Sequence, residues 1–317
     1  MEYAPVYAIG GITALLCLIL LFQKGLPGRI KFLTLVCAAL TACVLVLFLR
    51  REGADLPIPR RFRAPEPTPV EDLPQAASVR LTFPEGCTVA DVIALLSENG
   101  VAERDALWDA ARNGTFSAAP FPEDLPEGTE RLEGYLFPDT YDFYLPEDPS
   151  SALNRLLSNF RRRTEPYADG IASAAERGYD LHALVTIASL IEKETDGTDQ
   201  KNIASVIYNR LEGPGSRHGT YGLLQIDAAV LYGLPDHTGP LTRGDLEADT
   251  PYNLYKYPGL PPGPIASPGL TAFQAALDPA ETDYYYYALA KDGRHRFFSD
   301  YSEFTAFLRS GDYVGNG

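Results

Sequence analysis

Two long apolar segments near the N-terminus constrain this chain more than any other feature. Residues 6–22 (VYAIGGITALLCLILLF) and 32–49 (FLTLVCAALTACVLVLFL) contain no charged side chain. Each approaches the roughly 20 residues that a helix needs to cross a bilayer. Neither has the polar face of a soluble helix. A signal peptide would begin with basic residues, whereas this chain begins with Met1–Glu2 and has a second apolar segment. Residues 1–51 are therefore predicted to form a two-span membrane anchor.

The charges beside these segments leave the orientation of the anchor open. Lys24, Arg29 and Lys31 favour a connecting loop in the cytoplasm, but a group of arginines after the second segment favours the opposite orientation. Residues 52–77 carry six prolines and almost no apolar periodicity. This composition predicts an extended spacer between the membrane and the rest of the chain.

The charge of the remaining chain argues against some partners. Residues 1–63 hold eight Lys or Arg and three Asp or Glu, so residues 64–317 hold 19 basic and 39 acidic side chains, a net charge of −20. Nucleic acid and anionic lipid are therefore not expected as main partners of the globular part. Neither zinc-type spacing of cysteines and histidines nor a nucleotide-binding glycine loop is present, so no metal and no cofactor are expected.

The globular part is predicted to be α+β. Residues 78–119 form a small unit with a strand at 78–83 and helices at 89–99 and 103–114. Residues 120–317 form the main domain, with helical patterns at about 150–178, 181–194, 200–211, 226–233 and 271–277. Two strands follow at 284–290 and 295–299, joined by a KDG turn, and a helix at 302–308 closes the chain. Helices dominate in this arrangement.

The helix predicted at 181–194 carries carboxyl groups where its apolar face continues. At about 100° per residue, Glu192 and Glu194 both fall within the arc formed by Leu181, Leu184, Val185 and their apolar neighbours. A desolvated carboxyl group stays protonated to higher pH, as a general acid requires. An ion pair or a solvated helix end would explain the same pattern. Spacing does not choose between these readings, nor between the two residues.

Other stretches suit a carbohydrate cleft. The segment YGLLQID (221–227) places Gln225 and Asp227 after a glycine-bearing turn, and PYNLYKY (251–257) presents Tyr252 and Asn253. Amides and aromatic rings bind the hydroxyl groups and ring faces of sugars. Taken singly, each also fits a structural role as a cap, a solvated helix residue or part of the core. The four histidines lie in no HExxH arrangement and near no GxSxG, which leaves a carboxylate-centred site.

Five motifs together resemble a known family. In order they are LEGYLFPDTY (132–141), IEKET (191–195), ASVIYNRL (204–211), PYNLY (251–255) and GLPPGPIASPG (259–269). They resemble the YceG-like/MltG family of endolytic murein transglycosylases over roughly residues 78–310. Two departures are visible. The family usually has one membrane span rather than two, and Ala228 stands where the family's Gln-x-Asp-Pro pattern has proline.

The resemblance implies a lysozyme-like, mainly helical catalytic domain preceded by a LysM-like subdomain at 78–119. It implies that the catalytic domain lies outside the plasma membrane and that Glu192 is the catalytic residue. Gln225, Tyr252, Asn253, Glu133 and Asp227 are the expected substrate-binding residues. The implied substrate is the bond between N-acetylmuramic acid and N-acetylglucosamine in peptidoglycan strands, cleaved to leave 1,6-anhydro ends, with trimming or termination of nascent strands as the expected role. Peptidoglycan synthases are further candidate partners.

Two alternatives stay open. Lysozyme-like hydrolysis would use a second carboxylate, for which Asp227, Glu133 and Asp139 are candidates. A membrane-anchored scaffold would bind peptidoglycan at a synthesis complex without turnover.

Overall fold

The computed structural model divides the chain into two compact units, Met1–Pro74 and Gln75–Gly317. In the first unit it describes residues 27, 30, 32–34 and 36–41, and in the second residues 77–117, 120–121, 130–195, 197–213 and 219–316. The predicted span 6–22 and the spacer to residue 76 lie outside the described residues. Of the predicted span 32–49, residues 32–34 and 36–41 are helical. No helix within the described residues is long and apolar enough to cross a membrane.

The second unit begins with the strand–helix–helix order expected from the sequence. β1 (Ser78–Thr82) is followed by α3 (Val89–Glu98) and α4 (Arg104–Asn113). Thr88 caps α3 in a capping box with Asp91. β1 pairs antiparallel with β2 (Thr140–Tyr144), in a register that sets Ser78 opposite Tyr144. β2 was not predicted, and through it the small unit shares a sheet with the segment that follows it.

The helices after β2 form the body of this unit. They are α5 (Pro149–Thr164), α6 (Ala168–Glu176), α7 (Leu181–Glu194), α8 (Gln200–Glu212), α9 (Asp227–Tyr232) and α10 (Leu270–Leu277). A single helical pattern was predicted over 150–178. The structure breaks it with a 3₁₀ turn, η2 (Glu165–Tyr167), where Pro166 lacks the amide hydrogen that an α-helix uses.

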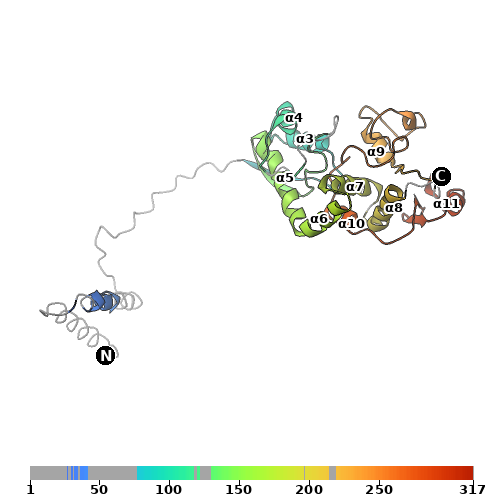
Figure 1. Ribbon diagram of the computed structural model, residues 1–317. Helices are drawn as coiled ribbons and strands as arrows, with labels where there is room; N and C mark the ends of the chain where they lie inside the picture. The colour runs from blue at the N-terminus through green and yellow to red at the C-terminus, as the bar shows by residue number, and fades with distance from the viewer. Residues whose placement is uncertain are drawn as a thin grey trace, which may run out of the picture. The chain divides into compact units, whose positions relative to one another are not determined.

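α7 is the central helix of this body. Figure 1 shows it in the middle of the unit, and it packs against α10, α8, α9 and α6. All residues from Leu184 to Ile191 are buried, including Thr186 and Ser189. Asp180 caps its N-terminus by accepting a hydrogen bond from the Ala183 amide. The sequence prediction for α7 is confirmed at both ends.

The chain ends in a second small sheet. β3 (Tyr286–Leu289) and β4 (His295–Phe298) form an antiparallel hairpin, and α11 (Tyr301–Leu308) packs on it. Two further 3₁₀ turns are η3 (Asp245–Glu247) and η4 (Val314–Asn316). The mixture of helices and two small sheets confirms the α+β class.

Candidate active site

Glu192 lies in the last turn of α7, where the buried part of the helix ends. Its side chain is half-buried, and its Oε2 accepts a hydrogen bond of 2.9 Å from the Gly269 amide. Burial raises the pKa of the Glu192 carboxyl group above its usual range, and the charge of Glu85 raises it further. The hydrogen bond from Gly269 and the charge of Lys193 act in the opposite direction. Glu192 is thus a partly desolvated acid that still reaches the surface.

The proline-rich loop 259–269 is held along α7 by three side chains of that helix. His182 Nε2 lies 3.0 Å from the Pro262 carbonyl oxygen, and the Ile265 amide donates to Ser189 Oγ at 3.0 Å. The bond from Gly269 to Glu192 is the third. Residues at these spacings lie near one face of a helix, so α7 and the loop run side by side. His182 and Ser189 therefore fix the loop whose Gly269 amide orients the Glu192 carboxyl group.

The turn between β1 and α3 approaches Glu192 from another side. The Gly86 amide donates to the Ser267 carbonyl at 2.8 Å, and the Ser267 amide donates to the Cys87 carbonyl at 2.8 Å. Lys193 Nζ lies 3.4 Å from the Gly86 carbonyl oxygen. Gly86 has φ of 75°, a conformation that glycine adopts without strain. Residues 84–88, from the small unit, therefore form part of the surroundings of Glu192.

Glu194 has a different environment. Its Oε2 accepts a hydrogen bond of 2.7 Å from the Tyr287 hydroxyl on β3. Burial raises its pKa, the Tyr287 hydrogen bond and the Arg210 charge lower it, and the Asp227 charge raises it. Glu194 thus connects α7 to the C-terminal hairpin, and this contact gives it a structural role.

Gln225 is presented on a strained backbone. Its φ is 53° and that of Tyr221 is 54°, in the left-handed region that residues other than glycine rarely adopt. The Gln225 amide donates to the Leu254 carbonyl at 3.0 Å, while the Gln225 side chain is exposed. Arg210, a buried residue on α8, donates to the Leu224 carbonyl beside it. Strain of this kind is often retained where a side chain must be aimed at a ligand.

Asn253 organises the loop that follows α9. It is fully buried, and its Nδ2 donates to the carbonyl oxygens of Leu246 and Ala248, both at 2.9 Å. Its Oδ1 accepts from the Tyr255 amide at 3.1 Å. The Tyr255 hydroxyl in turn donates to Asp227 Oδ1 at 2.5 Å. These contacts place Asn253 as a framework residue of the loop. Its predicted contact with substrate stays a prediction.

A cavity of about 600 Å³ contains two of the other predicted residues. It lies between the start of α3, α4, α9 and residues 250–252, and its lining includes Glu133, Tyr252, Tyr232 and Trp108. Glu133 is 2% exposed and accepts hydrogen bonds from the Val89 amide at 3.2 Å and from the Tyr232 hydroxyl at 3.2 Å. Burial raises the pKa of Glu133 to about 8, so the carboxyl group is mostly protonated at neutral pH.

Comparison with known proteins is consistent with this architecture. The model of the YceG-like family matches residues 66–310. The chain belongs to the YceG-like family.

This YceG-like chain is similar to two named proteins and to one crystal structure. It is 42% identical over 164 residues to a protein of Bacillus subtilis named endolytic murein transglycosylase, a match that covers 51% of the chain and 43% of that protein. It is 33% identical over 232 residues to a protein of the same name from Streptococcus pneumoniae, covering 65% of the chain and 40% of that protein. The matches thus span less than half of either relative. A crystal structure of a YceG-like protein from Listeria monocytogenes is similar with a TM-score of 0.62 and 31% identity, covering 72% of the chain and 75% of that structure.

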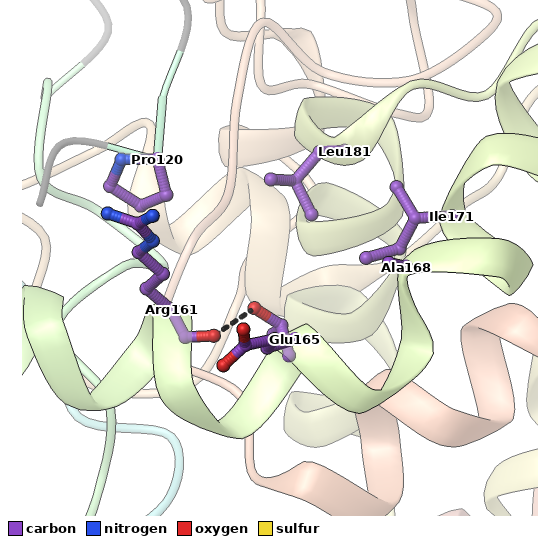
Figure 2. Close-up of a pocket in the computed structure, with 7 residues that line it drawn as sticks. Pro120, Arg161, Glu165, Ala168, Ile171 and Leu181 are labelled. Carbon is purple, nitrogen blue, oxygen red and sulfur yellow. Dashed lines mark hydrogen bonds between the residues drawn. The ribbon is translucent and has the colours of Figure 1, made fainter.

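A second cavity of this YceG-like chain lies away from Glu192. It has a volume of about 320 Å³ and is lined by Pro120 and by residues of α5, η2, α6 and the start of α7, among them Arg161, Glu165 and Leu181 (Figure 2). Leu181 and Glu192 are eleven positions apart on α7, a distance of roughly 16 Å along a helix. The chemistry-bearing residues of the sequence are not among its lining. In the described residues, no group of three or more His, Cys, Asp or Glu is placed to hold a metal ion.

The sequence did not single out the turn at 84–88 or Arg210. Residues 84–88 read as an ordinary turn, although they contact the loop beside Glu192. In the sequence Arg210 is only one residue of ASVIYNRL, although its side chain donates to the Leu224 carbonyl and, at 2.7 Å, to the Tyr285 carbonyl. Both contacts join segments that are distant in sequence, and no local pattern indicates them.

Proposed function

We propose that this chain is a lytic transglycosylase of peptidoglycan in which Glu192 is the general acid and then the general base. The observation that carries the proposal is the half-buried Glu192 carboxyl group, oriented by the Gly269 amide at the end of α7. The names of the B. subtilis and S. pneumoniae relatives support the choice of peptidoglycan as substrate.

One carboxyl group suffices for the proposed reaction. Glu192 in its protonated form donates its proton to the glycosidic oxygen between N-acetylmuramic acid and N-acetylglucosamine as positive charge develops at C1. The resulting carboxylate then removes the proton from the muramoyl C6 hydroxyl group, whose oxygen bonds to C1. The products are a 1,6-anhydro end and a free N-acetylglucosamine hydroxyl group, and no water is consumed. The raised pKa of Glu192 favours the protonated form that starts the cycle.

The remaining predicted residues are proposed to position the glycan. Gln225 offers an exposed amide on its strained turn. Tyr252 and Glu133 line the 600 Å³ cavity, which combines aromatic rings with a protonated acid that can donate a hydrogen bond to an uncharged sugar. Asp227 is held by Tyr255, and Asn253 fixes the loop that carries both Tyr252 and Tyr255.

The setting of this activity is also a proposal. The apolar segments 6–22 and 32–49 would anchor the chain in the plasma membrane, with residues 78–317 on its outer side, where peptidoglycan is built. There it would trim or terminate nascent strands, with peptidoglycan synthases as candidate partners and the LysM-like unit contacting glycan. A reporter fused after Gly317 tests the orientation, because an external signal is expected and a cytoplasmic signal would contradict the assignment.

Mass spectrometry of the products tests the chemistry. The full chain, purified in detergent, is incubated with isolated peptidoglycan beside its Glu192→Gln variant. Anhydromuramoyl ends that appear only with the unmodified chain are expected. Reducing ends would instead indicate a lysozyme-like hydrolase. Intact glycan in both samples would contradict an enzyme and favour a peptidoglycan-binding scaffold.

A further inference from the structure

Gly269 lies between two carboxyl groups that come from distant parts of the chain. Its amide donates to Glu192 Oε2 at 2.9 Å. On its other side, a β-carbon built on Gly269 would overlap the carboxyl group of Glu85. Glu85 belongs to the turn between β1 and α3, so the small unit places an acidic side chain directly against the glycine that orients Glu192.

The two carboxyl groups are therefore close. The 2.9 Å hydrogen bond, the roughly 2.5 Å between an amide nitrogen and the β-carbon position of one residue, and the overlap with Glu85 together place their oxygens no more than about 7 Å apart. At this separation two charges interact measurably even when solvent screens them.

The position of Glu85 is set by the backbone around it. The Gly86 amide bonds to the Ser267 carbonyl, and the Ser267 amide bonds to the Cys87 carbonyl, each at 2.8 Å. Lys193, next to Glu192 on α7, reaches the Gly86 carbonyl oxygen. The turn is thus fastened both to the 259–269 loop and to α7 through Gly86 and Cys87, the two residues that follow Glu85.

We propose that Glu85 is a positioning residue of the reaction, a second carboxylate that acts on Glu192 across Gly269 and adds to the effect of burial in favouring the acid form of Glu192 before substrate is cleaved. The inference rests on the proposed function, since it concerns the proton that Glu192 donates. It also gives the small unit a part in catalysis, because that unit supplies the charge.

Two charged groups of opposite sign face Glu192. Glu85, from the turn, disfavours the ionised form of Glu192, and Lys193, from α7, favours it. The proline-rich loop (259–269) and α10 contain no titratable side chain. Of the charged groups on α8 and α9, Arg210 and Asp227 act on Glu194, and neither is among the charges that shift the pKa of Glu192. Removing the charge of either Glu85 or Lys193 should therefore shift the protonation of Glu192, and the two shifts should have opposite signs.

The pH dependence of kcat/KM for anhydromuramoyl product formation tests this inference, with the full chain in detergent. Activity should fall as pH rises and the free enzyme loses the Glu192 proton. Glu85→Gln should move this alkaline limb to lower pH by about half to one unit, and Lys193→Gln should move it to higher pH by a similar amount. Glu98→Gln, at the exposed far end of α3, is the matched control and should leave the profile unchanged.

A second measurement varies the salt concentration. High salt screens the charge of Glu85, so 1 M salt should bring the limbs of the unmodified chain and of Glu85→Gln closer together. An unshifted limb in Glu85→Gln, or shifts of the same sign in Glu85→Gln and Lys193→Gln, would overturn the inference and leave the proposed function intact. Absence of anhydromuramoyl product from the unmodified chain would overturn the proposed function itself.

Discussion

Glu192 and Glu194 are two residues apart on α7, yet they bond to different parts of the fold. Glu192 accepts from the Gly269 amide in the proline-rich loop, and Glu194 accepts from the Tyr287 hydroxyl on β3. Neighbouring carboxyl groups on one helix therefore have separable roles, one at the proposed reaction centre and one in the packing of the C-terminal hairpin.

Substitution at the two positions should separate activity from stability. Glu192→Gln removes the proposed general acid, and turnover of peptidoglycan should fall at least about 100-fold. The free energy of unfolding should not fall, because an uncharged amide replaces a partly desolvated acid. Tyr287→Phe should cost about 1–3 kcal/mol of stability, because it leaves the Glu194 carboxyl group without this hydrogen bond. Urea unfolding measures the free energy of unfolding of both variants.

The control for the tyrosine is Tyr301→Phe. Tyr301 is 61% exposed, and its ring contacts survive the substitution. Its stability should change by less than about 0.5 kcal/mol. Equal losses in Tyr287→Phe and Tyr301→Phe would contradict the structural role given to Glu194.

Because the backbone of Gln225 is strained, two substitutions at this position should affect activity alike and stability differently. Gln225→Gly and Gln225→Ala both remove the amide proposed to contact glycan, so both should weaken product formation. Only glycine relieves a φ of 53°, and Gln225→Gly should be more stable than Gln225→Ala by about 1 kcal/mol. Thermal unfolding of the two variants measures the difference. A more stable alanine variant would show that the backbone strain is absent in solution.

Gly134 should be among the least replaceable glycines, for two independent reasons. Its φ is 83°, and an added β-carbon would meet Pro264 and Val185 at 2.6–2.7 Å. Gly100 has a similar φ of 73° but nothing within 4 Å, so Gly100→Ala measures the backbone cost alone, about 1 kcal/mol. Gly134→Ala should cost about 1–3 kcal/mol more than that through overpacking between α7 and the proline-rich loop. Similar losses in the two variants would argue against this close approach.

The sequence predicts those helices and strands whose capping residues and apolar spacing lie within the segment itself. α7 was predicted at both ends because Asp180 and the apolar period lie within the segment itself. β2 is not predicted because it pairs with a distant strand, β1. The paired residues Arg80 and Asp142 are 62 positions apart in the sequence. The choice between Glu192 and Glu194 could not come from spacing, because their bonding partners lie 77 and 93 residues along the chain. Family resemblance favoured Glu192, and its catalytic role stays a prediction.

Asp139 should contribute acid-sensitive stability. Hydrogen bonding to Arg163 lowers the pKa of Asp139 from 3.8 to about 2, with Asn159 and the Thr140 amide assisting. The folded state therefore holds this proton less tightly than the unfolded chain. The contribution is complete above pH 4 and is lost as pH falls through about 2, so Asp139→Asn should cost on the order of 1 kcal/mol at pH 6 and nothing near pH 2. Asp142→Asn, in the exposed pair with Arg80, is the control and should have a smaller effect.

Glu133 should show the opposite dependence on pH. Burial raises its pKa to about 8, whereas an unfolded chain releases this proton near the ordinary value of 4.5. Between these two values the folded state holds a proton that the unfolded state has lost, so rising pH favours unfolding. Below about pH 4 both states are protonated, and above about pH 8 both are ionised, so the dependence from this residue is confined to that window.

Glu133→Gln removes the titrating group and retains an oxygen that can accept from the Val89 amide. The stability of this variant relative to the unmodified chain should increase steadily from pH 5 to pH 8, by about 2–4 kcal/mol in total. Urea unfolding at a series of pH values gives this difference, in which the contributions of other titrating groups cancel. A difference independent of pH would mean that Glu133 is already ionised at neutral pH. The cavity would then present a charge rather than a hydrogen-bond donor to the glycan.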